Sequence, residues 1–525
     1  MSTGGRTRVA GLSAVGCLLA LAGCGVVAPA PSVSPPAETV SPRASASSVP
    51  PAPPPPTAAD PALSQALAGL LASPALTGTG DVTSALVSDG TTGVPIYALN
   101  ADRAVAPAST LKAITAMAAL DILGPDYRFH TTVAAGGAPT GGVLSGDLVL
   151  RGGGDPTLLE SDLTDLAAQV KAMGVTRVTG RLLVDAGCFD SVRYHPDWDA
   201  SRDANVSRPQ IAGLTASVDG LGSNGTVRHV GALVVGYSPG GVGEPATVTL
   251  TPAAASGYVT VVNKTTTSAS GSDRITVART PGTNTITLTG SIGAAQPHHT
   301  WPMSVDDPGL YAGHLFRAAL ARQGIVVGAP TNAPATPGTT VLASHDSAPL
   351  RDVVAAMLKQ SNNGYAEHLT KTLGRIGDTP GTWESGTARV RSWVAGSGSP
   401  AAGVAIRDGS GFSLDDRLTA RTLVQSLDRA RGLGWFDDFY AGLPVAGNPD
   451  PLVGGTLADR MIGTSAAGNL RGKTGSLPGV SALAGYVTGA DGRRYTFALL
   501  SNFAGDSPVA LEDRLGVLLA GWRHP

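Results

Sequence analysis

The chain has 525 residues, of which 42% are hydrophobic, and it contains 69 glycines and 39 prolines. This length suffices for roughly two to four domains with sizeable apolar cores. The 37 lysines and arginines nearly balance the 39 aspartates and glutamates, so the formal net charge is −2. A nearly neutral chain with 5% aromatic residues lacks the basic face and the stacking platform of a nucleic-acid-binding protein. The composition therefore excludes nucleic acid as an expected partner.

Residues 1–24 have the layout of an export signal. Arg6 and Arg8 precede an apolar stretch, residues 9–22, which is shorter than the roughly 20 residues of a membrane-spanning helix. The stretch runs into Leu-Ala-Gly-Cys, ending at Cys24, which resembles the lipidation signal of bacterial lipoproteins. We therefore expect an extracytoplasmic protein that a lipid on Cys24 anchors to the membrane. A protein secreted after a cut near residues 28–30 is the alternative.

Residues 25–60 form a linker rich in Pro, Ala and Ser. Such a composition buries too little apolar surface to fold, and its prolines favour an extended, semi-stiff spacer. Because Cys17 and Cys24 precede this linker, Cys188 is the single thiol expected in the folded body. A lone cysteine excludes an internal disulfide and a cysteine metal site, and we interpret it as a small buried hydrophobe.

The first part of the body, residues 61–133, mixes helices and strands. Helical apolar spacing covers residues 61–71, and strand-like runs at residues 82–87 and 94–99 flank a turn at Asp89-Gly90. Residues 111–123 are apolar nearly all round, which predicts a buried helix.

The middle of the chain, residues 134–340, consists mainly of short β-like runs separated by Gly, Ser, Thr and Pro. The helix predicted at residues 163–173 interrupts these runs. After residue 305 the helical texture returns, and the predicted elements are helices at residues 310–322, 350–373 and 508–522 and strands at residues 482–488 and 495–501. We predict one α/β (α+β) domain, residues 61–133 and 341–525, into which one or two mainly β domains, residues 134–340, are inserted.

The first motif with catalytic potential is Ser109-Thr110-Leu111-Lys112, at the start of the predicted buried helix. Residues three apart lie on one face of a helix, so the serine hydroxyl and the lysine amine can meet. A serine hydroxyl needs a nearby base to become a nucleophile, and a lysine whose pKa is lowered by burial can serve.

Two further motifs lie near the C-terminus. In Ser361-Asn362-Asn363, Ser361 can relay a proton to a leaving nitrogen, and Asn363 offers a donor and an acceptor to a substrate amide. The other motif is Lys473-Thr474-Gly475-Ser476, which we place on an edge strand. Lysine and threonine there can bind a carboxylate, glycine lets a substrate backbone approach, and the amides of Ser476 and Ser109 can form an oxyanion hole.

The order of the three motifs resembles the Ser-x-x-Lys, Ser-x-Asn, Lys-Thr-Gly set of penicillin-binding proteins and class A β-lactamases. The gap between the first two motifs is too long for a class A β-lactamase. It is similar to that of the class C low-molecular-mass penicillin-binding proteins, the D-Ala-D-Ala carboxypeptidase/endopeptidase family, which carries inserted domains there. The likeness extends from about residue 62 to the end, and includes residues 146–158 and 408–413.

This resemblance implies a penicillin-binding/β-lactamase-like transpeptidase domain and roles for the motif residues. Ser109 would be the nucleophile and Lys112 the general base, while Ser361 would move protons. Asn363, Lys473 and Thr474 would bind the substrate, and Lys473 and Thr474 would hold its terminal carboxylate.

The implied activity is that of a serine-type D-Ala-D-Ala carboxypeptidase that trims peptidoglycan stem peptides. Action as an endopeptidase on cross-links stays open, β-lactams would be inhibitors, and no cofactor is implied. A β-lactamase and a catalytically inactive peptidoglycan-binding scaffold are the alternatives. The intact motif residues argue against the scaffold.

Three other features receive structural interpretations. His298-His299 has no third ligand at a recognisable spacing, so no metal site is expected there. Asp155, after three glycines and before Pro156, is interpreted as a turn residue. Asp408-Gly409-Ser410-Gly411 is interpreted as a structural loop beside the active site.

Overall fold

The structure is a computed structural model that describes residues 60–73, 76, 81–198, 204–222, 225–334, 338–377, 379–398 and 402–524. The predicted export signal, Cys24 and residues 25–59 of the predicted linker lie outside the described residues. Among the residues that are described, no helix is both long and apolar enough to cross a membrane.

The two ends of the body meet in one antiparallel sheet, ordered β18-β19-β20-β1-β2. Its strands are β1 (Val82–Asp89), β2 (Pro95–Leu99), β18 (Arg471–Leu477), β19 (Val480–Thr488) and β20 (Arg494–Asn502). β1 pairs with β20 along its whole length and with β2 as the predicted hairpin. The predicted helix over residues 61–71 is confirmed as α1 (Pro61–Leu71), and the chain closes with α10 (Val509–Gly521).

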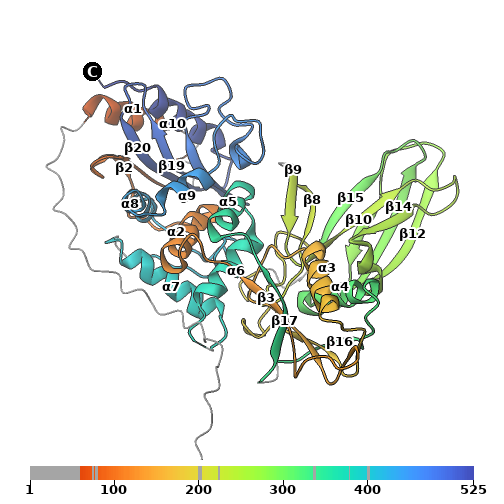
Figure 1. The fold of residues 1–525 in the computed structure, drawn as a ribbon. Coiled ribbons are helices and arrows are strands. Elements are labelled where there is room, and N and C mark those ends of the chain that lie inside the picture. The colour runs from red at the N-terminus through yellow and green to blue at the C-terminus, as the bar shows by residue number, and fades with distance from the viewer. Residues whose placement is uncertain are drawn as a thin grey trace, which may run out of the picture. The chain divides into compact units, whose positions relative to one another are not determined.

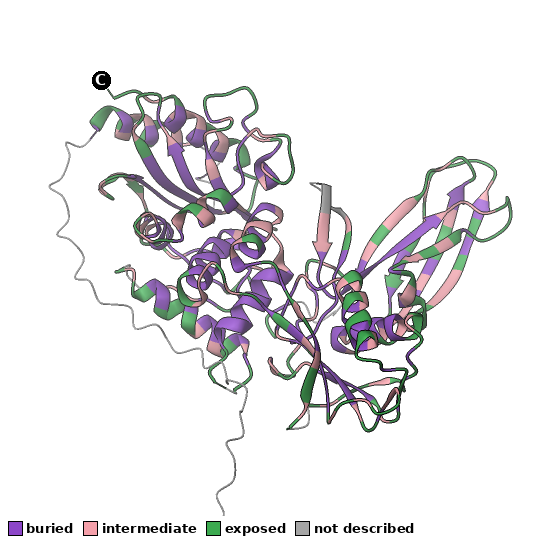
Figure 2. Cartoon of the chain, in the orientation of Figure 1, coloured by how far each residue is buried: buried purple, intermediate pink, exposed green. Residues whose placement is uncertain are grey.

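The alternation of side chains along β19 and β20 explains how this sheet is covered on both faces. Leu483, Phe497 and Leu499 pack with α1 and α10 on one face. Ala484 and Leu500, one position along, pack with the helices of the other face, α2 (Leu111–Leu123) and α8 (Ala420–Ala430). Figure 1 shows this layering, and Figure 2 shows β19, β20 and α2 coloured almost entirely as buried.

α2 lies among the helices α5 (Leu350–Gln360), α6 (Asn363–Leu373), α7 (Trp383–Ala395) and α9 (Phe436–Gly442). The helical stretch predicted at residues 350–373 is in fact two helices. Ser361 ends α5 with a left-handed φ of 54°, and the Asn362 side chain accepts a hydrogen bond from Tyr365 N at 3.2 Å to begin α6. A Ser-Asn pair favours the end of one helix and the beginning of the next, because both side chains compete with the helix for backbone hydrogen bonds.

The middle of the chain begins and ends in a shared sheet, ordered β16-β7-β5-β3-β17. Its strands are β3 (His130–Ala135), β5 (Leu148–Arg151), β7 (Leu182–Asp185), β16 (Pro330–Asn332) and β17 (Thr340–Asp346). β3 and β17 pair antiparallel, so the chain enters and leaves this region side by side. The helices α3 (Glu160–Ala172) and α4 (Pro308–Arg322) pack with this sheet.

Smaller sheets complete the middle region. They are β11-β10-β15, β12-β14-β13, β4-β6 and β8-β9. Their strands are β4 (Val143–Leu144), β6 (Arg177–Val178), β8 (Val218–Gly222), β9 (Gly225–His229), β10 (Ala232–Ser238), β11 (Thr247–Thr251), β12 (Thr260–Ser268), β13 (Thr276–Arg279), β14 (Thr285–Gly293) and β15 (His299–Ser304). The apolar residues between 133 and 343 form a core of their own.

Candidate active site

Ser109 lies on a short 3-10 turn, η2 (Ala108–Thr110), that runs directly into α2. Thr110 Oγ1 donates to Pro107 O at 2.6 Å and fixes this turn. The fully buried Lys112 Nζ donates to Ser109 Oγ at 2.9 Å and to Ser410 O at 2.8 Å. The predicted pair is therefore in direct contact.

The surroundings of Lys112 favour its neutral form. Burial lowers the pKa of its amine from 10.5 to about 8, against the opposing effect of the carboxylates Asp408, Glu367 and Asp416. A neutral amine 2.9 Å from a serine hydroxyl can accept its proton. The arrangement is that of a nucleophile and its base.

The second and third motifs also meet. Lys473 Nζ donates to Ser361 Oγ at 2.9 Å and to Thr474 O at 2.9 Å. Burial holds the pKa of the Lys473 amine well below its ordinary value, and the charge of Lys112 lowers it further. An arriving carboxylate would favour the ammonium form again, because it supplies an opposite charge at this buried site.

The third motif lies on β18, which is an edge strand of the sheet, as predicted. Thr474 Oγ1 donates to Thr456 Oγ1 at 2.8 Å, and Ser476 is exposed. A Cβ on Gly475 would lie 2.7 Å from Pro107 O, so β18 can pack this closely against the Ser109 turn only because position 475 is glycine. Lys473 to Ser476 thus lie beside Ser109.

Asn363, the first residue of α6, has a different environment from the other motif residues. Its Nδ2 donates to Ser207 O at 2.8 Å, and the Nδ2 of neighbouring Asn362 donates to Arg228 O at 2.7 Å. Both amides therefore bind the middle region of the chain. Asn363 remains half-buried.

A group of buried carboxylates lies behind Lys112, and of these only Asp408 was singled out in the sequence, as part of a structural loop. Ser410, whose carbonyl accepts from Lys112, belongs to the loop predicted beside the active site, which is thereby confirmed. Glu367 and Asp408 each accept hydrogen bonds from backbone amides of this loop, and both are fully buried. Asp416 lies beside them and is equally buried. The sequence offered one indication of this group, which is the charged residue Glu367 on a helix that is buried on nearly all sides.

Asp155, Cys188 and His298, to which the sequence assigned no catalytic or metal-binding role, have structural surroundings that agree with this. Asp155 Oδ1 accepts from Thr157 N at 2.8 Å, as expected of a turn residue. Burial raises the pKa of the Cys188 thiol to about 12, which makes it a poor nucleophile. His298 Nδ1 lies 2.9 Å from Ser238 Oγ, and within the described part of the chain no group of three or more His, Cys, Asp and Glu side chains could hold a metal ion.

Comparison with known proteins agrees with this geometry. The profile of the D-Ala-D-Ala carboxypeptidase 3 (S13) family matches residues 63–520. A D-alanyl-D-alanine carboxypeptidase from a species of Actinomadura is 40% identical over 457 residues, which cover 86% of this chain and 83% of the relative. Carboxypeptidase DacB of Mycolicibacterium smegmatis is 31% identical over 512 residues, 90% of each chain.

The crystal structure of penicillin-binding protein 4 from Haemophilus influenzae superposes with a TM-score of 0.71 at 23% identity, covering 86% of this chain and 98% of that one. This likeness confirms the predicted penicillin-binding fold. Family, relatives and fold agree with the three motifs and with the contacts that join them. The chain belongs to the D-Ala-D-Ala carboxypeptidase 3 (S13) family and is a serine-type D-Ala-D-Ala carboxypeptidase of the class C low-molecular-mass penicillin-binding proteins.

Proposed function

We propose that this carboxypeptidase acts through an acyl-enzyme on Ser109, with Lys112 as the general base. The hydrogen bond of 2.9 Å between Lys112 Nζ and Ser109 Oγ is the observation that carries the proposal. Neutral Lys112 removes the hydroxyl proton while Ser109 Oγ attacks the carbonyl of the penultimate D-Ala. The amides of Ser109 and Ser476 stabilise the oxyanion that forms.

The other motif residues complete the reaction. Ser361, in contact with Lys473, delivers a proton to the leaving D-Ala nitrogen, and water then hydrolyses the acyl-enzyme. Lys473 and Thr474 bind the terminal carboxylate of the substrate. Asn363 holds the peptide amide. The glycine at position 475 lets β18 lie close to the Ser109 turn, rather than making room for the substrate as the sequence suggested.

Peptidoglycan stem peptides are the proposed substrate, because they end in D-Ala-D-Ala. β-Lactams, which mimic this dipeptide, are the proposed inhibitors, and the Haemophilus influenzae protein has a structure in complex with a β-lactam. Cleavage of cross-linked dimers of stem peptides would show endopeptidase action, whereas release of D-Ala from single stem peptides would show carboxypeptidase action.

We also propose that the chain acts outside the cytoplasm, anchored by a lipid on Cys24. Residues 1–24 are the export signal and residues 25–60 the linker. The separate apolar cores support a catalytic domain of residues 61–133 and 341–525, interrupted by an inserted region of residues 134–340. Mass spectrometry of the N-terminal peptide from membranes tests the anchor, and Cys24→Ser should release the protein. An unmodified N-terminus after residues 28–30 would contradict it.

The test of the catalytic proposal is the intact mass of the chain from Thr57 onward after incubation with benzylpenicillin. We expect a persistent adduct on the unmodified protein and none on Ser109→Ala, and Ser109→Ala should also fail to release D-Ala from a stem peptide. Consumption of the drug without an adduct would indicate a β-lactamase. If neither an adduct nor consumption of the drug is observed, an inactive scaffold is favoured.

A further inference from the structure

One peptide segment behind the active site has all of its polar backbone groups bound. Gly409 N and Ser410 N donate to the Glu367 carboxylate at 3.0 and 2.8 Å. On the other side, Gly409 O accepts from Thr115 Oγ1 at 2.7 Å and Ser410 O accepts from Lys112 Nζ at 2.8 Å. The Gly409–Ser410 segment therefore connects Glu367 on α6 to the base on α2.

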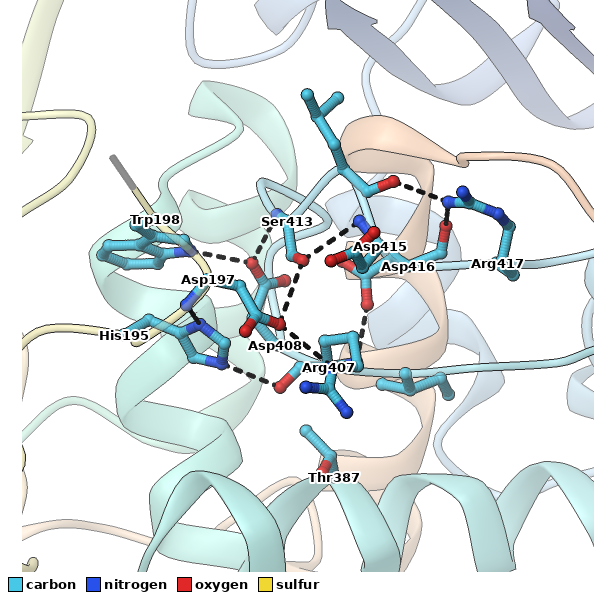
Figure 3. Close-up of polar contacts among 12 residues, drawn as sticks. His195, Asp197, Trp198, Thr387, Arg407, Asp408, Ser413, Asp415, Asp416 and Arg417 are labelled. Atoms are coloured by element: carbon cyan, nitrogen blue, oxygen red, sulfur yellow. Dashed lines mark hydrogen bonds and ion pairs between the residues drawn. The ribbon is translucent and has the colours of Figure 1, made fainter. Parts of the chain in front are cut away.

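Asp408 anchors the same loop from its own side chain. Its Oδ1 accepts from Gly411 N at 2.6 Å, and its Oδ2 accepts from Ser413 N at 2.7 Å and Trp198 Nε1 at 3.0 Å. Figure 3 shows Trp198 and Ser413 directed at this carboxylate. Asp408 is fully buried, so the loop rests on a carboxylate that water does not reach.

Asp416 faces Asp408 and carries a polar atom with no partner. Its Oδ1 accepts from Arg407 N at 2.7 Å, whereas its buried Oδ2 makes no hydrogen bond. Burial and the charge of Asp408 raise the pKa of Asp416 well above its ordinary value. The raised pKa favours the protonated form of Asp416, which would lessen the negative charge beside Asp408.

The loop packs closely against the backbone and side chains around it. A Cβ on Gly409 would lie 1.8 Å from Thr370 Oγ1, and a Cβ on Gly411 would lie 1.9 Å from Ala108 O. The loop is thus wedged between α6 and the turn that carries Ser109. A change at Glu367 or Asp408 reaches Lys112 through this connection.

We propose that Glu367, Asp408 and Asp416 are positioning residues for Lys112. Through the hydrogen bonds of the loop around Gly409 and Ser410 they aim its amine at Ser109. This inference rests on the proposed function, in which Lys112 is the general base.

The charges around Lys112 determine whether its amine is neutral or protonated. Lys112 interacts with Glu367, Asp408 and Asp416 on one side and with the amine of Lys473 on the other. Ionised carboxylates favour the ammonium form of Lys112, which cannot accept the serine proton. Protonation of the cluster therefore favours the active base.

Glu367 is the member of the cluster that titrates near neutrality. Burial, with the charge of Asp408, raises the pKa of Glu367 to about 7. Trp383 Nε1 donates to its Oε2 at 2.7 Å, and the buried amine of Lys371 is its cationic neighbour on the same helix. The amide of glutamine can still accept a hydrogen bond from the loop, but it carries no charge.

The test is the pH dependence of acylation by benzylpenicillin in Glu367→Gln. We expect the acidic limb of the acylation rate to move to lower pH by about one unit, because a negative charge near Lys112 is lost. Trp383→Phe, which removes a donor that stabilises the Glu367 anion, should move the limb in the same direction by less. Asp416→Asn should move the limb in the same direction but by less than Glu367→Gln, because the raised pKa of Asp416 already favours its neutral form.

Glu512→Gln is the matched control. Glu512 is also buried with a pKa raised to about 7, but its partners are Ser481 and Arg460 rather than the Lys112 loop. Its limb should coincide with that of the unmodified enzyme. The positioning role would be overturned if the acidic limbs of Glu367→Gln and Trp383→Phe coincided with that of the unmodified enzyme. It would also be overturned if Glu512→Gln shifted the limb as much as Glu367→Gln does. Acylation of Ser109 in the unmodified enzyme would leave the proposed function standing in either case.

Discussion

Buried lysine amines provide the reactive groups of this site. Lys112 and Lys473 are both fully buried, and loss of hydration lowers the pKa of each. Each nevertheless keeps a serine hydroxyl and a backbone carbonyl as hydrogen-bond partners. The site thus holds two amines whose affinity for a proton is lowered by burial before the substrate arrives.

The pH dependence of acylation follows from the pKa of Lys112, about 8. Only the neutral amine accepts the serine proton, so the acylation rate should rise with pH and level off above about pH 8. Intact-mass time courses with benzylpenicillin at several pH values measure this rate. A rate that is flat through this range would show that Lys112 does not act as the base.

Lys473→Ala should affect substrates with a free terminal carboxylate most. Loss of a charged hydrogen bond should lower kcat/KM for a D-Ala-D-Ala peptide by about 10- to 100-fold. Acylation by a simple ester without that carboxylate should fall much less. An equal loss on both substrates would remove the proposed role of Lys473.

At the scale of elements, two glycines allow the Ser109 turn to be held from both sides. Gly475 brings β18 against Pro107, and Gly411 brings the 408–411 loop against Ala108. The turn that carries Ser109 is therefore held by close backbone packing. Side chains at either position would separate these elements.

Gly411→Ala should destabilise the fold and slow acylation together. Gly411 has a φ of 77°, and the new Cβ would lie 1.9 Å from Ala108 O. Left-handed strain and overpacking together should lower the free energy of unfolding by about 2–5 kcal/mol. Gly463→Ala is the control, because Gly463 has a φ of 71° but no atom near its missing Cβ. Chemical denaturation should show a loss of only about 1–2 kcal/mol for the control; equal losses would refute the packing argument.

At the scale of the whole molecule, the middle of the chain, which is the proposed inserted region, contacts the proposed catalytic part through polar side chains as well as apolar ones. His195 Nε2 lies 2.9 Å from Arg407 O, and Trp198 donates to Asp408, as Figure 3 shows. Lys371 Nζ on α6 donates to Asp190 Oδ1 at 2.6 Å and lies 3.8 Å from the centre of the Trp383 ring. The residues behind Lys112 are therefore tied to the inserted region.

Asp190→Ala should destabilise the chain, because it leaves the fully buried Lys371 amine without its carboxylate. A loss of about 2–3 kcal/mol is expected in the free energy of unfolding. Asp102→Ala provides the control, since Asp102 pairs with Arg421 at an exposed position and should cost less than about 1 kcal/mol. Denaturant unfolding compares the two variants. Similar small losses would mean that the Lys371 pair does not support the fold.

Much of the secondary structure followed from the sequence, because burial imposes regular apolar spacing. The helices at residues 61–71 and 111–123 have the predicted bounds, and most predicted strands lie within a few residues of theirs. Periodicity alone did not divide the helical stretch at residues 350–373, because apolar spacing continues across Gln360 and the φ of Ser361 leaves no trace in it. Helices α7 and α8 were missed as well.

The sequence by itself determined the family and the contact between Ser109 and Lys112, because the two residues are close in sequence and helix geometry brings them together. Only the tertiary structure decided that Lys473 donates to Ser361 and that Asn363 binds Ser207. It also revealed the carboxylates behind Lys112. These contacts join residues far apart in the chain, and no local rule of backbone geometry predicts which buried polar groups will meet.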